Sequence, residues 1–228
     1  MNQLRDMLID GKMPLIMSMP VNNPALARVA WESGADAVKV HINVVHHASS
    51  TVFRSFEEEK ESVLQMLEEA KGSMGIVLAG SSKLAEQDLE RAKNAGFDFI
   101  SLYGQHATER VMHCSGVSKM IAPDYTWQDW EIMQLEHQGA DILEASVMHP
   151  DSYGERLNLR DVIRYRHLSE ITQLPIVVPT QHVIYAHEVA WLKENGVGGI
   201  MIGAVVTGKD EIGIAKTVES FRKEIDKL

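Results

Sequence analysis

The stretch GVGGIMIGAVVTGK, residues 196–209, predicts a short buried strand at 199–202 that ends in Gly203, with a helix from Asp210. Glycine at a strand end lets a ligand approach the backbone N–H groups closely. The N-terminus of a helix that follows favours an anion through its dipole. The stretch therefore predicts a phosphate-binding corner at Gly203, at the end of a repeated strand–helix chain.

Two short phrases alternate along the whole sequence. One begins with glycine and runs into an apolar strand, and its four copies start at Gly34, Gly96, Gly139 and Gly196. The other is a short apolar strand, and its four copies start at Pro14, Met74, Lys119 and Pro175. Apolar strands that alternate with amphipathic helices indicate a parallel sheet. Eight such strands predict a closed (β/α)8 TIM barrel formed by residues 1–228 as a single domain. An open doubly wound sheet is the alternative.

Composition limits the classes of partner. The 228 residues carry a net charge of -10, which argues against a nucleic-acid-binding surface. No apolar run approaches the ~20 residues of a membrane span, so no membrane association is predicted. The single cysteine, Cys114, leaves no internal disulfide and favours the reducing cytoplasm. No signal peptide is expected from the acidic N-terminal segment.

The repeated glycines give a common reference from which the positions of residues inside the barrel can be counted. Five residues after it come Lys39, Ser101, Glu144 and Met201, and seven after it come His41, Tyr103, Ser146 and Gly203. Residues two apart on a strand share a face, and matched positions on alternate strands share one layer inside a barrel. Lys39 and Glu144 are therefore predicted to meet from opposite walls, with His41, Tyr103 and Ser146 one level nearer the catalytic mouth.

Four residues are the catalytic candidates. Lys39 could serve as a base, as a Schiff-base nucleophile or as a cation beside a carbonyl group, with Glu144 as its partner. A structural ion pair that fills the barrel is the alternative for these two. His41 and Asp124 are candidates for the second proton carrier. The alternatives are a satisfied core histidine for His41 and a helix cap for Asp124.

Further polar residues lie near the predicted strand ends. Asn43 is a candidate substrate hydrogen-bonder beside His41, and Thr180, Gln181 and His182 flank the corner at Gly203. His46 and His47 match no metal-ligand spacing, and no nearby acid completes a set, so no metal site is predicted. No cofactor is predicted either, while a flavin or a divalent metal stays open.

The sequence from residue 175 onward, PIVVPTQHVIYAHEVAWLKENGVGGIMIGAVVTGKDEIGIAKTVESF, resembles the last quarter of the phosphate-binding (ribulose-phosphate-type) TIM barrels. It is most similar to N-acetylmannosamine-6-phosphate 2-epimerases. The resemblance implies that the backbone amides of Gly203 and Ala204 hold a phosphate. It does not extend to the catalytic residues, because Pro179 and residues 79–81 stand where those epimerases have a glutamate and a lysine.

These observations predict an enzyme that acts on a small phosphorylated, carbohydrate-like substrate by proton transfer next to a carbonyl, as an isomerase or epimerase. One alternative is a Schiff-base aldolase or lyase that uses Lys39. Another is a barrel that binds a phosphorylated metabolite or a flavin without catalysis. The expected partner is a small anionic metabolite, and a homodimer stays open.

Overall fold

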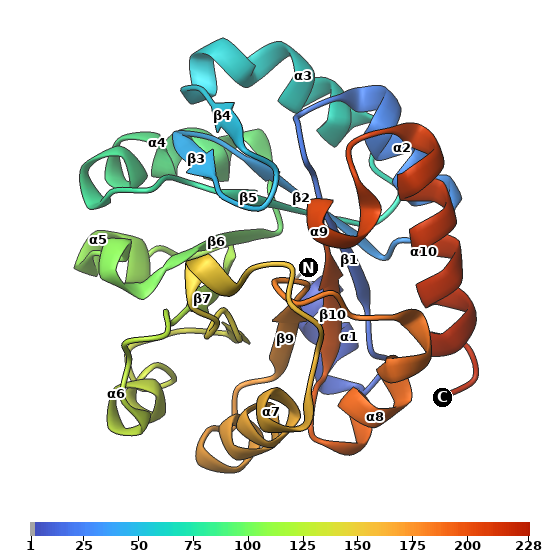
Figure 1. Ribbon diagram of the computed structural model, residues 1–228. Helices are drawn as coiled ribbons and strands as arrows, with labels where there is room; N and C mark the ends of the chain where they lie inside the picture. The colour runs from blue at the N-terminus through green and yellow to red at the C-terminus, as the bar shows by residue number, and fades with distance from the viewer. Residues whose placement is uncertain (1–2) are drawn as a thin grey trace.

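Eight parallel strands close into a barrel in the computed structural model, which describes residues 3–228 (Figure 1). Each strand pairs with its sequence neighbour in the barrel, and β10 pairs with β1 to close it. The (β/α)8 prediction is confirmed, and the open sheet is wrong. The strands are β1 (Leu15–Ser18), β2 (Ala37–His41), β5 (Ser73–Val77), β6 (Phe99–Tyr103), β7 (Ser118–Ala122), β8 (Ile142–Glu144), β9 (Ile176–Pro179) and β10 (Gly199–Ile202).

Helices surround the barrel, as the amphipathic segments between the strands predict (Figure 1). Helix α6 begins only at Asp129, so Trp127 lies before it and covers Gly104. The helices are α1 (Gln3–Ile9), α2 (Pro24–Glu32), α3 (Phe56–Glu68), α4 (Ser82–Ala95), α5 (Glu109–Met112), α6 (Asp129–Gln134), α7 (Leu159–Ile171), α8 (Val189–Glu194), α9 (Ala204–Thr207) and α10 (Glu211–Ile225), with 3-10 turns η1 (Gly104–His106), η2 (Pro150–Ser152) and η3 (Ala186–Glu188).

The N-terminal end of the barrel is filled by apolar side chains. Helix α1 covers this end and contributes Leu4 and Leu8. The Phe99 ring crosses the interior above Gly75, where an added Cβ would lie 2.1 Å from the ring. Glycine is therefore required on β5 at this level. The remaining members of this apolar cluster are Ile16, Ala37, Met120, Ile142, Val177 and Met201.

The aspartates of the glycine phrases have a structural role at the same end. In three of the four copies, the carboxylate accepts a hydrogen bond from the first backbone N–H groups of the preceding strand. Asp36 accepts from Leu15 N, Asp98 from Met74 N and Asp141 from Lys119 N, each at 2.8 Å. The repeated phrase thus ties neighbouring strands together at the rim where the barrel is closed.

A hairpin lies at the opposite, C-terminal end. The segment after β2 forms the antiparallel strands β3 (Val44–His46) and β4 (Thr51–Phe53). Figure 1 views the barrel from this end, with the hairpin in front of it. The hairpin places His46 and His47 at the mouth. Within residues 3–228, no helix is long and apolar enough to cross a membrane.

Candidate functional site

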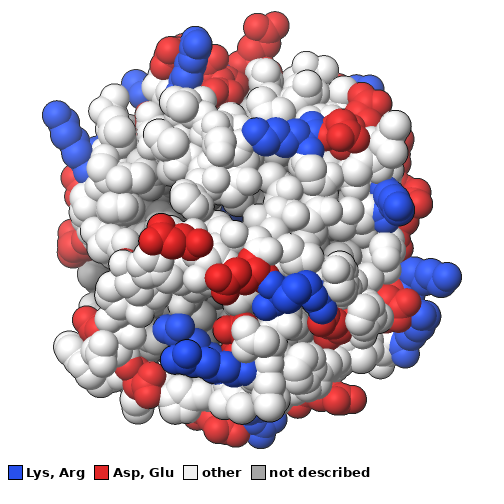
Figure 2. Space-filling view, in the orientation of Figure 1, with Lys and Arg blue, Asp and Glu red and all other residues white. Residues whose placement is uncertain are grey.

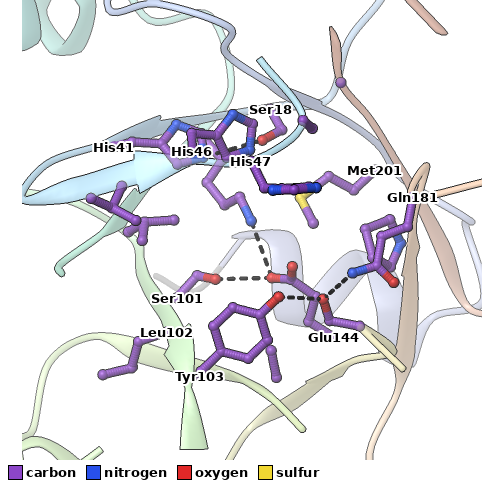
Figure 3. Close-up of a pocket in the computed structure, with 18 of the residues that line it drawn as sticks. Ser18, His41, His46, His47, Ser101, Leu102, Tyr103, Glu144, Gln181 and Met201 are labelled. Carbon is purple, nitrogen blue, oxygen red and sulfur yellow. Dashed lines mark hydrogen bonds and ion pairs between the residues drawn. The ribbon is translucent and has the colours of Figure 1, made fainter. Parts of the chain in front are cut away.

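A cavity of about 180 Å³ opens at the C-terminal end of the barrel. Its lining includes the apolar side chains of Val77, Leu102 and Met201 together with charged and hydroxyl groups from β2, β6, β8 and β9 (Figure 3). Figure 2 shows the same face with charged side chains of both signs scattered over it. The carboxyl ends of the strands are where TIM-barrel enzymes place their reacting groups.

Lys39 and Glu144 form an ion pair at the floor of this cavity, as their matched distance from the repeated glycines predicts. Lys39 Nζ lies 3.1 Å from Glu144 Oε2, and the two residues are only 4% and 7% exposed. Ser101 Oγ donates to the same carboxylate oxygen at 2.9 Å. Within residues 3–228, Glu144 Oε1 has no hydrogen-bond partner, although the residue lines the cavity. One carboxylate oxygen and two ammonium hydrogens are therefore free to contact a ligand.

His41 lies one level above this pair, at the end of β2. Asn22 holds its backbone from both sides, since it accepts from His41 N at 3.2 Å and donates to His41 O at 2.7 Å. The ring stacks on Phe53 with centroids 4.8 Å apart, and its Nε2 lies 3.4 Å from Ser18 Oγ. Burial, with His46 and Lys39 nearby, holds the pKa of His41 well below its usual range. The imidazole is therefore neutral near pH 7.

The two histidines of the hairpin lie around His41. His46 Nδ1 is 2.7 Å from Ser49 Oγ, and burial together with the Lys39 charge lowers the pKa of His46 to about 4. His47 contacts Pro150 O at 3.2 Å and packs edge-on against Tyr153, so the hairpin touches the loop after β8. In the described part of the chain, no three His, Cys, Asp or Glu side chains are grouped to hold a metal.

Three hydroxyls and one amide form a network on the opposite wall. We call Tyr103, Ser146, Tyr153 and Gln181 the hydroxyl cluster. Tyr103 OH lies 3.2 Å from Ser146 Oγ, Gln181 Nε2 donates to Ser146 Oγ at 2.6 Å, and the same nitrogen donates to Tyr153 OH. Tyr153 is not among the site residues predicted from the sequence. A tyrosine within a loop carries no spacing signal that would single it out.

The predicted phosphate corner is occupied by a side chain of the protein. Gly203 N donates to Thr180 Oγ1 at 3.0 Å, and both residues line the cavity. Ala204 begins α9 and does not line the cavity. One of the two amides predicted to hold a phosphate is thus already engaged.

Three further predicted site residues, besides Ala204, lie outside the cavity. Asn43 adopts a left-handed backbone, with φ of 52°, and its amide donates to Asp88 Oδ2 at 2.7 Å. Asp124 caps a turn, because its carboxylate accepts from Thr126 N at 2.8 Å. His182 Nε2 lies 3.3 Å from Oδ2 of Asp161 in α7. The alternative role for Asp124, a cap, is the one its contacts support.

Comparison with known proteins supports the fold. No family model matches the sequence, and no curated protein matches it. Among solved structures, thiamine phosphate pyrophosphorylase from Pyrococcus furiosus is similar with a TM-score of 0.65 and 17% identity, over 96% of this chain and 98% of that one. Mycobacterium tuberculosis tryptophan synthase gives 0.73 and 11%, over 97% and 96%. Phosphoribosylanthranilate isomerase from Thermotoga maritima gives 0.65 and 13%, over 95% and 100%.

At these identities the similarity establishes the TIM-barrel fold. Two of the three proteins are named for phosphorylated compounds. The narrower resemblance to N-acetylmannosamine-6-phosphate 2-epimerases stays a prediction.

Proposed function

We propose that this protein is an enzyme that moves a proton next to a carbonyl group of a small phosphorylated, carbohydrate-like substrate. The observation that carries the proposal is the ion pair of Lys39 and Glu144 at the floor of the cavity. Burying two charges is costly unless they are well paired, so a matched pair that still faces an open cavity suits a reaction site better than a filler.

The free atoms of the pair define the chemistry. Glu144 Oε1 is the base that accepts the proton from the carbon next to the carbonyl group. Lys39 Nζ donates to the carbonyl oxygen and stabilises the negative charge that develops there as the enolate forms. Return of the proton from Glu144 to the former carbonyl carbon, with the neighbouring hydroxyl proton passing to the former carbonyl oxygen, gives isomerisation. Epimerisation instead requires that a proton reach the opposite face of the carbon that lost it. Ser101 holds Glu144 Oε2, so the other oxygen faces the substrate.

The substrate class rests on size and on the neighbouring folds. A cavity of about 180 Å³ is smaller than the ~300–1,000 Å³ of sites for drug-sized ligands, which favours a small metabolite over a flavin. Thiamine phosphate pyrophosphorylase and phosphoribosylanthranilate isomerase share the fold and are named for phosphorylated compounds. Both features support a phosphorylated substrate of a few carbons.

Solvent-hydrogen exchange tests the proposal directly. A panel of aldose and ketose phosphates, including N-acetylmannosamine 6-phosphate and ribulose 5-phosphate, is incubated with the protein in D2O and followed by proton NMR. The wild type should exchange the hydrogen next to the carbonyl in one of them. Lys39→Met and Glu144→Gln should each slow exchange about 10²–10⁴-fold, the usual contribution of a positioned acid–base group.

Lys119→Met is the matched control. Lys119 also pairs with a carboxylate, Asp141 at 3.2 Å, but it does not line the cavity. Its exchange rate should equal that of the wild type. Proton transfer by this pair would be refuted if Lys39→Met exchanged the substrate hydrogen at the wild-type rate. It would also be refuted if the wild type exchanged that hydrogen in none of the compounds. Borohydride treatment with substrate separates the lyase alternative, because a mass adduct on Lys39 requires an imine.

A further inference from the structure

The hydroxyl cluster lines the cavity with four hydrogen-bond donor groups, three hydroxyls and one amide. Gln181 is fixed in orientation, because its Oε1 accepts from the backbone N–H of Met148 at 3.3 Å. Its amide nitrogen must then donate both hydrogens, and it does so to Ser146 and Tyr153. The hydrogens of the three hydroxyls are left for the remaining contacts.

The other hydrogen bonds of the cluster do not engage every hydroxyl hydrogen. Tyr103 OH and Ser146 Oγ share one hydrogen, whichever of the two donates. The Tyr153 oxygen accepts from Gln181, so its own hydrogen is available to another acceptor, either the neighbouring Tyr103 oxygen or a ligand. Burial, followed by the nearby Tyr103 hydroxyl, raises the pKa of Tyr153, so this hydroxyl keeps its proton at neutral pH. All four residues line the cavity, so a ligand there can receive the hydroxyl hydrogens.

A group that accepts hydrogen bonds and donates none matches such a surface. Phosphate and carboxylate oxygens have this character, and hydrogen bonds to them are stronger than those between neutral partners. The one nearby carboxylate, Glu144, is neutralised by Lys39 and does not leave a net negative charge on the cavity floor. The cluster also lies one level nearer the mouth than this pair, as a substrate's charged end would when its carbonyl group reaches the floor.

We propose that the hydroxyl cluster, and not the corner at Gly203, binds the phosphate or carboxylate group of the substrate, with Gln181 directing the hydroxyl hydrogens toward it. The Gly203 amide is engaged by Thr180, which supports this displacement of the anion site toward β6, β8 and β9. The inference rests on the proposed function for the rest of the substrate, whereas binding of the anion needs no turnover.

Titration of the unliganded protein with inorganic phosphate, and separately with acetate, tests the site by calorimetry at low salt. Tyr153→Phe removes the free donor and should weaken binding about tenfold or more, as expected for a hydrogen bond to a charged group. Gln181→Glu keeps the shape of the side chain but turns its donor into an acceptor. The hydroxyl hydrogens then point to the introduced carboxylate instead of the cavity, and anion binding should be lost.

Matched controls exclude general effects of these changes. Tyr125→Phe and Gln138→Glu make the same substitutions at exposed positions away from the cavity, and both should bind like the wild type. Thr180→Val frees the Gly203 amide and should leave binding by the cluster unchanged within about twofold. Circular dichroism confirms that each variant is folded.

The outcomes separate the candidates. Phosphate binding without acetate binding, lost in Tyr153→Phe and Gln181→Glu, identifies a phosphate ester, and the reverse preference identifies a carboxylate. Equal binding by these variants and the wild type, no binding of either anion, or a gain in Thr180→Val alone would overturn the inference. Glu144→Gln distinguishes the two proposals, because it removes the base without leaving a negative charge on the floor, and should lose exchange of the substrate hydrogen yet still bind the anion.

Discussion

The two ends of the barrel are built from the same eight strands but from opposite kinds of side chain. At the N-terminal end, Phe99 and the residues from α1 fill the interior with apolar atoms, and aspartates fasten the rim. At the C-terminal end, Lys39, Glu144 and the hydroxyl cluster contact one another around a cavity. On β6 the change occurs within two residues, from Phe99 to Ser101.

This difference indicates a division of labour along each strand. Apolar burial is worth about 25 cal/mol per Å² and requires no partner of matching charge. Buried polar groups must instead be satisfied by one another, which restricts them to the few positions where partners meet. The closed end should therefore set the stability of the barrel, and the open end its chemistry and its response to pH.

The largest expected effect comes from Phe99→Ala at the closed end. The ring is fully buried and covers Gly75, so its removal leaves a cavity that the rigid strands cannot close. The free energy of unfolding should fall by about 3–5 kcal/mol, as for other buried Phe→Ala changes. Urea denaturation measures this loss.

The same variant tests whether the two ends are separable. Phe99→Leu serves as the control, because it keeps much of the apolar volume and should lose less than half as much stability. Folded Phe99→Ala should exchange the substrate hydrogen with solvent at a rate within a few-fold of the wild-type rate. Loss of exchange comparable to that of Lys39→Met would show that the closed end also positions the reacting groups.

The repeats in the sequence were sufficient to predict the barrel and its central ion pair. Every second barrel strand follows a repeated glycine, and Gly34, Gly96, Gly139 and Gly196 adopt the left-handed φ values of +108°, +98°, +94° and +83° expected of helix ends. The fixed distance from these glycines gave the layer in which Lys39 meets Glu144. Alternation of side chains is reliable as long as the backbone remains extended.

The errors begin where the strands end. Alternation after Lys39 and His41 predicts that Asn43 faces inward, but its left-handed backbone turns the amide toward Asp88. Asp124 follows β7 by two residues, and the chain has already turned there. Loop conformation depends on contacts distant in sequence, such as those of Tyr153 with Gln181, which no local pattern encodes.

The next expected effect is a pH dependence at the open end. His46 has a pKa of about 4 in the folded protein against 6.5 for the free side chain, so the unfolded chain binds the extra proton first. Stability from this group is complete above 6.5 and is lost as the pH falls toward 4. When the pH is lowered from 7 to about 4.5, the free energy of unfolding should fall by about 2 kcal/mol less in His46→Gln than in the wild type.

The groups around His46 sharpen this test. Lys39, His47 and Lys209 all disfavour its charge, and His41 lies at 4.5 Å between ring centroids. His137→Gln, at an exposed position, is the control and should follow the wild-type profile. If His46→Gln shows the same profile as the wild type, the hairpin opens on its own at low pH and contributes nothing to the stability of the barrel.

The smallest expected effect returns to the closed rim. Asp98 accepts from Met74 N and, unlike Asp36 and Asp141, forms no ion pair in the described part of the chain, so it isolates the repeated hydrogen bond. Asp98→Ala leaves that N–H without its partner and should lower the unfolding free energy by about 1–2 kcal/mol in urea denaturation. Asp98→Asn retains an acceptor oxygen and should recover much of the loss.

Exchange of the substrate hydrogen should be unchanged in both variants, because the rim lies at the far end of the strands from Glu144. A fall in exchange with unchanged stability would break the separation between the two ends, since the bond would then act on the reacting groups through β5 and β6.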